Sequence, residues 1–199
     1  MMMTNFPDYF KATNEAYLLL SEYTGNYPVI DIFSIFLKMP YVKVYTFSEY
    51  ANKLSLNVSE FLQIAPSDYG FSIYDKCTKK WLVFYNDLKS NTTIRFTLAH
   101  ELGHIVLNHT SDDNISQSEA NCFGRNLLCP VPIRKAFHLE KISDYCSCFD
   151  ISEPMAEATI GNDYSDSYYI TQENFQKVDN NIYCYFSGYS LAELYGYSS

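Results

Sequence analysis

Residues 97–107, Thr97-Leu-Ala-His-Glu-Leu-Gly-His-Ile-Val-Leu107, hold the most informative pattern of this sequence. His100, Glu101 and His104 form an H-E-x-x-H motif in a stretch that favours a helix. On a helix, two histidines four residues apart lie on one face, so both imidazoles can reach a single zinc ion. Glu101 is then directed at the water that the zinc holds. The pattern therefore predicts the helix of a zinc metallopeptidase.

The composition fits one folded domain without a nucleic-acid surface. The chain has 199 residues, of which 47% are hydrophobic, so it can bury a sizeable core. A net charge of −9 opposes phosphate binding, which needs clustered Lys and Arg. We expect a single metallopeptidase domain over residues 1–199, with its core at about 41–155, a helical N-terminal segment at 1–40 and a Tyr-rich C-terminal segment at 161–199.

The N-terminus predicts a cytoplasmic protein. It has no basic residue before Lys11 and no apolar core, so it does not resemble a signal peptide. The apolar run 29–37 is about half the length of a membrane-spanning helix, and Asp31 interrupts it. The six cysteines are irregularly spaced, without a C-x-x-C pair, and we expect free thiols that are mostly buried.

The rest of the sequence predicts an α+β fold that is zincin-like: a small, mostly antiparallel sheet packed against the H-E-x-x-H helix and several further helices. Period-two alternation indicates a strand at 41–47, and residues 70–75 and 81–85 indicate a hairpin. An exposed edge of this sheet could bind an extended substrate through backbone hydrogen bonds. Ser48 and Ser59 are candidate caps of two short helices. Helices are expected at 10–22, 30–37, 48–54, 59–65, 92–108, 116–128, 133–149 and 152–160.

A catalytic zinc usually has three protein ligands, so the two histidines need a partner. His109 is disfavoured, because it lies about 180° around the helix from His100 at roughly 100° per residue. Another class of zinc peptidases breaks this helix with a glycine to bring in a third histidine, but Leu107 stands at that position. His109 therefore suits a structural role at the end of the helix.

Downstream carboxylates are the other candidates for the third ligand. Asp112 and Asp113 lie in the loop after the motif, and Glu119 lies on the next expected helix. Glu119 is favoured, because a ligand on a second packed helix is held rigidly. A solvated Glu119 that stabilises the first helical turn is the competing interpretation, and the pattern alone leaves the choice open.

Two blocks of the sequence resemble the ImmA/IrrE family of metallopeptidases. The first is Arg95-Phe-Thr-Leu-Ala-His-Glu-Leu-Gly-His-Ile-Val-Leu107, and the second is Glu119-Ala-Asn-x-Phe-x-x-x-Leu-Leu-x-Pro130. The segments 83–86 and 149–153 also look like that family, so the resemblance covers roughly residues 41 to 155. Gly124 departs from the pattern, since the family commonly has Ala there.

The resemblance implies a zinc cofactor with His100, His104 and Glu119 as ligands and Glu101 as the catalytic base. Asn121 is a candidate for orienting one of the zinc ligands through a hydrogen bond without binding the metal itself. A further donor could stabilise the oxyanion. The sequence does not select one from the conceivable donors Tyr85, Arg125 and His138.

The resemblance also implies a protein substrate. Members of the family typically act on helix-turn-helix repressors encoded beside them, in phages or mobile elements, so that proteolysis releases transcription. Such an anti-repressor role suits an acidic chain that binds neither nucleic acid nor membrane. The alternative is a non-catalytic antirepressor that inactivates the repressor by binding, although a purely structural metal site gives Glu101 no reason to be Glu.

Overall fold

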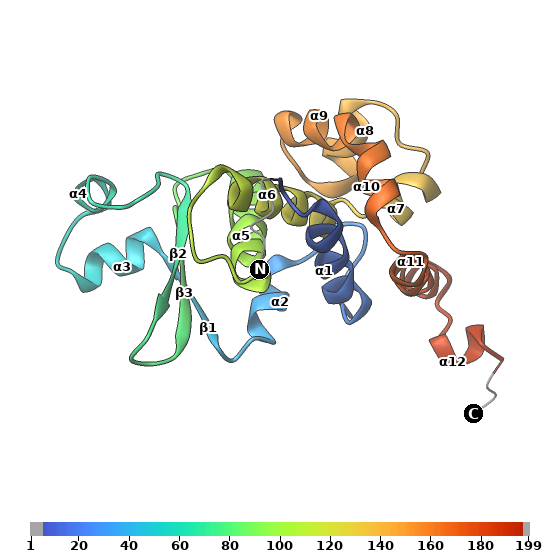
Figure 1. Cartoon of the computed structure of the whole chain (residues 1–199), viewed down its shortest axis with the longest axis horizontal. Helices are drawn as coiled ribbons and strands as arrows, with labels where there is room; N and C mark the ends of the chain where they lie inside the picture. Colours follow the sequence, from blue (N-terminus) through green and yellow to red (C-terminus); the bar gives the residue numbers. More distant parts are fainter. Residues whose placement is uncertain (1–5, 197–199) are drawn as a thin grey trace.

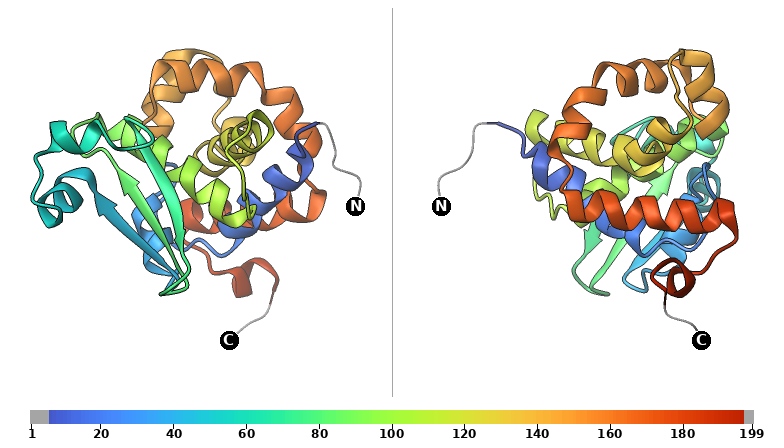
Figure 2. Two further views of the ribbon diagram at one scale, coloured as in Figure 1. Left: turned by 60° about the vertical axis from the view of Figure 1, so that its left-hand side comes forward. Right: turned by 90° about the vertical axis from the view of Figure 1, so that its right-hand side faces the viewer.

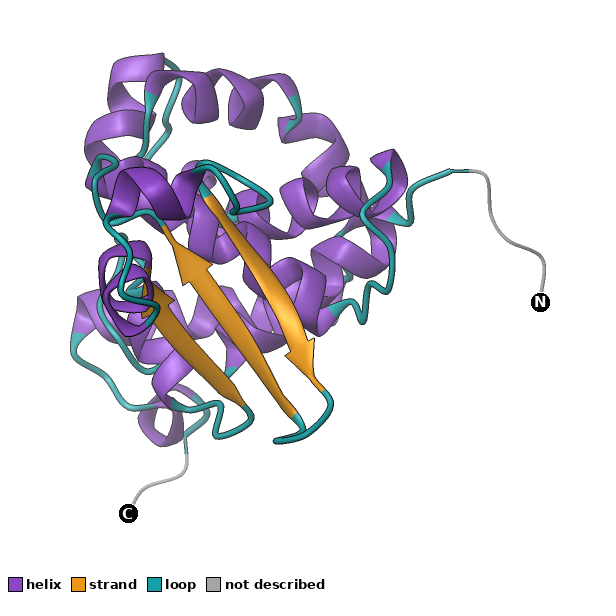
Figure 3. Ribbon diagram, turned by 90° about the vertical axis from the view of Figure 1, so that its left-hand side faces the viewer, coloured by secondary structure: helices purple, strands orange, loops and turns teal. Residues whose placement is uncertain are grey.

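A computed structural model describes residues 6–196 and places a small sheet on one side of a body of helices (Figures 1 and 3). The sheet consists of β1 (Val42–Thr46), β2 (Gly70–Asp75) and β3 (Lys80–Tyr85) in the order β1-β3-β2. β2 and β3 form the expected antiparallel hairpin, with Gly70 opposite Tyr85. The α+β class is therefore confirmed.

The pairing of β1 corrects the expectation of a mostly antiparallel sheet. β1 runs parallel to β3, with Val42 beside Trp81, so the sheet is mixed. The chain leaves β1 through α3 (Phe47–Lys53) and α4 (Val58–Leu62) before it enters β2. This long crossover lets β3 return beside β1 in the same direction, which a tight hairpin could not do.

Both faces of the central strand are covered. Successive side chains of a strand point to opposite faces, and Val83 and Phe84 are both buried, at 0% and 1% exposure. Val83 belongs to the main core, whereas Phe84 packs with Phe47 and Phe61 under α3 and α4.

The caps of these two short helices differ from the expected ones. α3 and α4 begin after Thr46 and Asn57, two residues before the expected Ser48 and Ser59. Each of these residues accepts a hydrogen bond from a backbone N–H in the first turn of its helix, and a Glu side chain three residues later bonds back to its N–H. Such capping boxes satisfy two backbone donors at once, which a lone serine could not match.

Helix α5 (Asn91–Val106) carries the H-E-x-x-H residues and lies between the sheet and α6 (Asn114–Leu128) (Figure 1). α1 (Tyr9–Ser21) packs against α6, and α2 (Ile32–Leu37) contacts α5. The helices expected at 10–22, 30–37, 92–108 and 116–128 are thus present. Leu98, Ala99 and Leu102 of α5 are all fully buried, so this helix is the centre of the main core.

The C-terminal part of the described chain is helical. It comprises α7 (Val131–Ala136), α8 (Ile142–Phe149), α9 (Glu153–Gly161), α10 (Asp163–Tyr169), α11 (Gln172–Ser187) and α12 (Leu191–Leu194). The single helix expected at 133–149 is wrong: His138, at a φ of 50°, lies in the break between α7 and α8. The Tyr-rich segment supplies α11, which runs beside α1 (Figure 2). Within residues 6–196, every helix is too short or too polar to cross a bilayer.

Candidate active site

Close packing of α5 and α6 positions the polar side chains of the site. A Cβ added at Gly103 would lie 3.1 Å from Ala120 Cα, and one at Gly124 would lie 3.3 Å from the backbone N of His100. The two helices can approach this closely only because small residues line their contact. Side chains of α6 that face α5 are therefore brought within reach of the histidines.

His100 and His104 converge as the motif predicts. Their Nε2 atoms lie 3.0 Å apart on one face of α5. Two nitrogens bound to one tetrahedral zinc at about 2.0–2.1 Å would lie roughly 3.3 Å apart. This pair of imidazoles therefore fits a shared zinc ion.

The surroundings keep both imidazoles neutral. Burial lowers the pKa of His100, against the opposing effect of its hydrogen bond to Asn121, and burial together with the neighbouring His100 and His109 lowers the pKa of His104 to about 4. His100 Nδ1 donates to Asn121 Oδ1 at 2.9 Å. This bond makes Nδ1 the protonated nitrogen of His100 and leaves the lone pair on Nε2, and a neutral imidazole with such a lone pair is the form that binds a metal.

Glu101 lies beside the imidazole pair and is almost buried, at 7% exposure. Ser72 Oγ on β2 donates to Glu101 Oε2 at 2.8 Å. Burial raises the pKa of Glu101 to about 7, the Ser72 hydrogen bond opposes this, and the charge of Asp112 adds to it. A carboxyl group that titrates near neutral pH can both accept and return a proton.

These residues line a cleft of about 1200 Å³. One wall is the outer part of β2, from Gly70 to Tyr74, and the other is α5 with the loop that follows it. β2 is an edge strand, because β3 covers one side of it and no described strand pairs with the other. The edge that faces the cleft, which the sequence left undefined, is therefore that of β2.

Glu119 does not join the histidine pair in this structure. Its Oε2 accepts a 2.8 Å hydrogen bond from His109 Nε2, and its Oε1 accepts a 2.7 Å hydrogen bond from the backbone N–H of Asp8. Asn108, at a φ of 57°, turns the chain after α5, and His109 Nδ1 then lies 2.9 Å from His104 Nδ1. Among residues 6–196, no three His, Cys, Asp or Glu side chains gather closely enough to hold a metal ion.

Gln117 takes the place beside the histidines that the sequence assigned to Glu119. Its Nε2 lies 3.3 Å from His104 Nε2 and 2.5 Å from Asp112 Oδ1. Sequence reasoning did not single out Gln117 or Ser72. The position of Gln117 could have been found, since it precedes Asn121 by four residues and so shares its helix face. Ser72 had no comparable signal.

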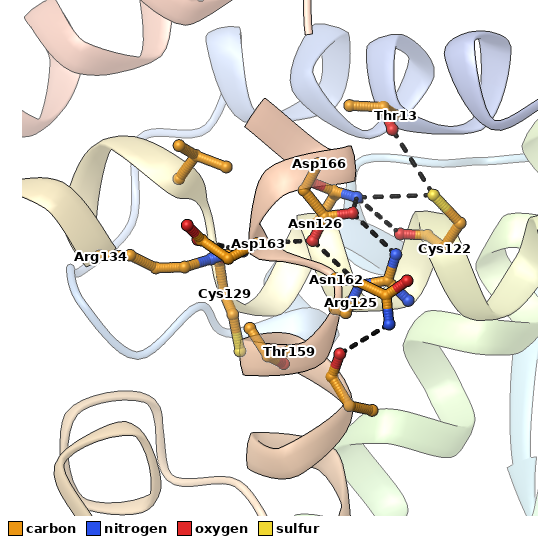
Figure 4. A network of polar contacts seen from close by, with 12 residues as sticks. Thr13, Cys122, Arg125, Asn126, Cys129, Arg134, Thr159, Asn162, Asp163 and Asp166 are labelled. Atoms are coloured by element: carbon orange, nitrogen blue, oxygen red, sulfur yellow. Dashed lines mark hydrogen bonds and ion pairs between the residues drawn. The ribbon is translucent and has the colours of Figure 1, made fainter. Parts of the chain in front are cut away.

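The three conceivable oxyanion donors lie away from this cleft. Arg125 forms hydrogen bonds of 3.0 and 2.7 Å with the two carboxylate oxygens of the buried Asp166, which Arg134 also contacts (Figure 4). Tyr85 lines a separate pocket with Asp31 and Arg95. His138 follows α7 and does not line the cleft either.

Comparison with known proteins agrees with this architecture. Residues 51–139, which include β2, β3, α5 and α6, match the family Peptidase_M78, described as the IrrE N-terminal-like domain. Residues 51–139 therefore match a domain of a metallopeptidase family, and the resemblance to the ImmA/IrrE family is confirmed. Neither a curated protein nor a solved structure matches the chain.

Proposed function

We propose that this protein is a zinc-dependent endopeptidase in which His100 and His104 bind the metal and Glu101 is the catalytic base. One observation carries the proposal: a nearly buried carboxyl lines a cleft together with two converging neutral imidazoles, and an edge strand forms one wall of that cleft. Peptide hydrolysis needs a Lewis acid, a base and a way to hold an extended chain. This cleft offers residues suited to each of the three.

Zinc bound by the histidines would polarise the scissile carbonyl and acidify a water molecule. Glu101 would take the proton from that water and deliver it to the nitrogen of the departing amine. Ser72 holds Oε2, so Oε1 is the oxygen placed to receive the proton. The raised pKa of Glu101, about 7, suits a group that must give the proton back.

The edge of β2 suits a substrate in extended conformation. Its free backbone groups could pair with a peptide, and Phe71, Ile73 and Tyr74 lie along the same wall of the cleft. The substrate that we propose is a cytoplasmic helix-turn-helix repressor, cleaved so that phage or mobile-element genes are transcribed. The family match supports a protein substrate.

The experiment is incubation with purified helix-turn-helix repressors of phages and mobile elements. The wild-type protein should cut the repressor, whereas Glu101→Gln should bind zinc equally and lose turnover by about 10²–10⁴-fold, the usual contribution of a positioned base. Glu157→Gln, at an exposed position of α9, is the matched control and should cleave like the wild type. A repressor that stays intact yet loses its DNA affinity would instead identify a non-catalytic antirepressor.

A further inference from the structure

We propose that Asp112, in the loop between α5 and α6, is the third protein ligand of the metal, and that Glu119 supports His104 through His109. The proposal rests on the zinc site of the proposed function and reverses the ligand assignment made from the sequence. Four observations lead to it: the face of α6, the position of the Gln117 amide, the place of Asp112 in the cleft and the partners of Glu119.

The face of α6 that meets the histidines is fixed by Asn121, which accepts the hydrogen bond from His100. At about 100° per residue, Gln117 lies roughly 40° from Asn121 around the helix and shares its face. Glu119 lies roughly 200° from each of them. The helix therefore directs Glu119 away from the point on which the two Nε2 atoms converge.

The amide of Gln117 occupies a place between potential ligands. Its nitrogen lies 3.3 Å from His104 Nε2 and 2.5 Å from Asp112 Oδ1. This NH₂ group lies between His104 Nε2 and the Asp112 carboxylate, and His100 Nε2 lies 3.0 Å from His104 Nε2, so a cation in its place would have all three acceptors nearby. A zinc ion there would take over the N–H contacts of Gln117 and be held by two nitrogens and one anionic oxygen.

Asp112 lines the cleft together with all three motif residues, His100, Glu101 and His104. Its loop lines the cleft, and the side chain is exposed, so it can move by the short distance that replacing an amide with a metal requires. A carboxylate is a common third ligand of catalytic zinc, and its negative charge offsets part of the charge of the ion.

In this arrangement Glu119 does not bind the metal but orients His104 through His109. A metal-binding histidine commonly donates its second N–H to a carboxylate, a carbonyl or a water, and the donated bond orients the ring. His104 Nδ1 meets His109 Nδ1 at 2.9 Å, and His109 Nε2 donates to Glu119 Oε2 at 2.8 Å. The backbone N–H of Asp8 holds the other oxygen of Glu119. To bind the metal, Glu119 would have to break its hydrogen bonds to His109 and Asp8 and leave His109 Nε2 without its partner.

Cobalt(II) in place of zinc tests the assignment directly, because a thiolate bound to cobalt gives an intense near-ultraviolet charge-transfer band. None of the six cysteines lines the cleft, so the wild-type protein with one cobalt per chain should lack this band. Asp112→Cys should gain it, since a deprotonated thiol is itself a metal ligand. Glu119→Cys should not gain it. His100→Ala should abolish cobalt binding in both backgrounds.

Zinc affinity, measured by competition with a chromogenic chelator, gives a second readout. Asp112→Asn should weaken zinc binding by about 100-fold or more. Glu119→Gln should weaken it by about tenfold, the smaller of the effects usual for a residue that supports a metal ligand through hydrogen bonds. A charge-transfer band in Glu119→Cys alone, or in neither cysteine variant, would overturn the assignment of Asp112. If the wild type and His100→Ala alike bind no zinc or cobalt, the proposed function fails together with it.

Discussion

Ser72 Oγ donates a 2.8 Å hydrogen bond to Glu101 Oε2 and so joins the edge strand β2 to helix α5. This bond links the strand that would hold a substrate to the carboxyl that would act on it. Burial raises the pKa of Glu101, and the hydroxyl of Ser72 opposes the rise by stabilising the carboxylate form. Ser72 is therefore expected to act as a positioning residue for Glu101.

Ser72→Ala should lower the turnover number by about 10- to 100-fold, which corresponds to a lost hydrogen bond to a charged group. Zinc content should not change, because the Ser72 hydroxyl bonds to Glu101 and to neither histidine. Loss of the bond raises the pKa of Glu101, so the acid limb of the kcat/KM profile should move to higher pH. Ser72→Thr keeps the hydroxyl and should restore both values. An unchanged pH profile in Ser72→Ala would show that the bond does not act on catalysis.

Gly103 allows the close contact of α5 and α6, and Gly103→Ala should disturb it. The added Cβ would lie 3.1 Å from Ala120 Cα and 3.2 Å from Ala120 O, and backbone atoms cannot move aside as a side chain can. We expect the free energy of unfolding to fall by about 1–3 kcal/mol, the usual cost of overpacking. Chemical denaturation followed by circular dichroism measures this value.

Gly161→Ala is the matched control for that variant. A Cβ at Gly161 would have no atom within 4 Å, so the methyl group meets no obstacle. The substitution should leave the free energy of unfolding unchanged or raise it by up to about 1 kcal/mol, because alanine restricts the unfolded chain. Equal losses in both variants would mean that helix packing at Gly103 is not the cause.

The sequence predicted the parts of the site that one helix determines. His100 and His104 converge because a four-residue spacing on a helix leaves little choice of geometry. The hairpin of β2 and β3 followed from alternating residues around a short turn. Both features depend on local periodicity, which a single sequence contains.

Features that depend on how distant segments pack together could not be predicted from local periodicity. The parallel pairing of β1 follows from a crossover of two helices, and no pattern within β1 specifies its direction. The placement of Glu119 depends on the rotation of α6 against α5, which Gly103 and Asn121 set through contacts with other elements. The family pattern drew attention to Glu119, whereas the structure places Gln117 beside His104.

The cysteines should differ in reactivity according to burial. Burial raises the pKa of Cys129 to about 12 and also raises that of Cys122, so both should be unreactive in the folded protein. Cys77 is exposed in the turn of the hairpin and should react first with an aromatic disulfide reagent. Cys77→Ser should remove the fastest phase. Reaction of six thiols in denaturant would verify that all of them are reduced.

Asp166 should be the most sensitive ion-pair position among the described residues. It is fully buried and contacts both Arg125 and Arg134, which links α10 to α6 and α7 (Figure 4). Asp166→Ala would leave two guanidinium groups without their shared anion, and breaking a buried pair in this way costs about 3–5 kcal/mol. Thermal and chemical unfolding measure the loss. Glu173→Gln, which breaks the exposed pair with Lys177, should not change the unfolding midpoint.

The Asp166 carboxylate should also make the free energy of unfolding depend on pH. Burial by itself raises the pKa of Asp166, but the hydrogen bond from Arg125 and the charges of both arginines outweigh it, and the pKa is lowered overall. A lowered pKa in the folded state stabilises the protein above the unfolded value of about 3.9. This contribution is lost as pH falls through the folded-state pKa, where a neutral Asp166 becomes similar to asparagine. The difference in unfolding free energy between the wild type and Asp166→Asn should therefore stay constant between about pH 5 and about pH 7. Below about pH 4 the difference should shrink. A difference that stays constant down to acid unfolding would show that the charge of Asp166 does not contribute.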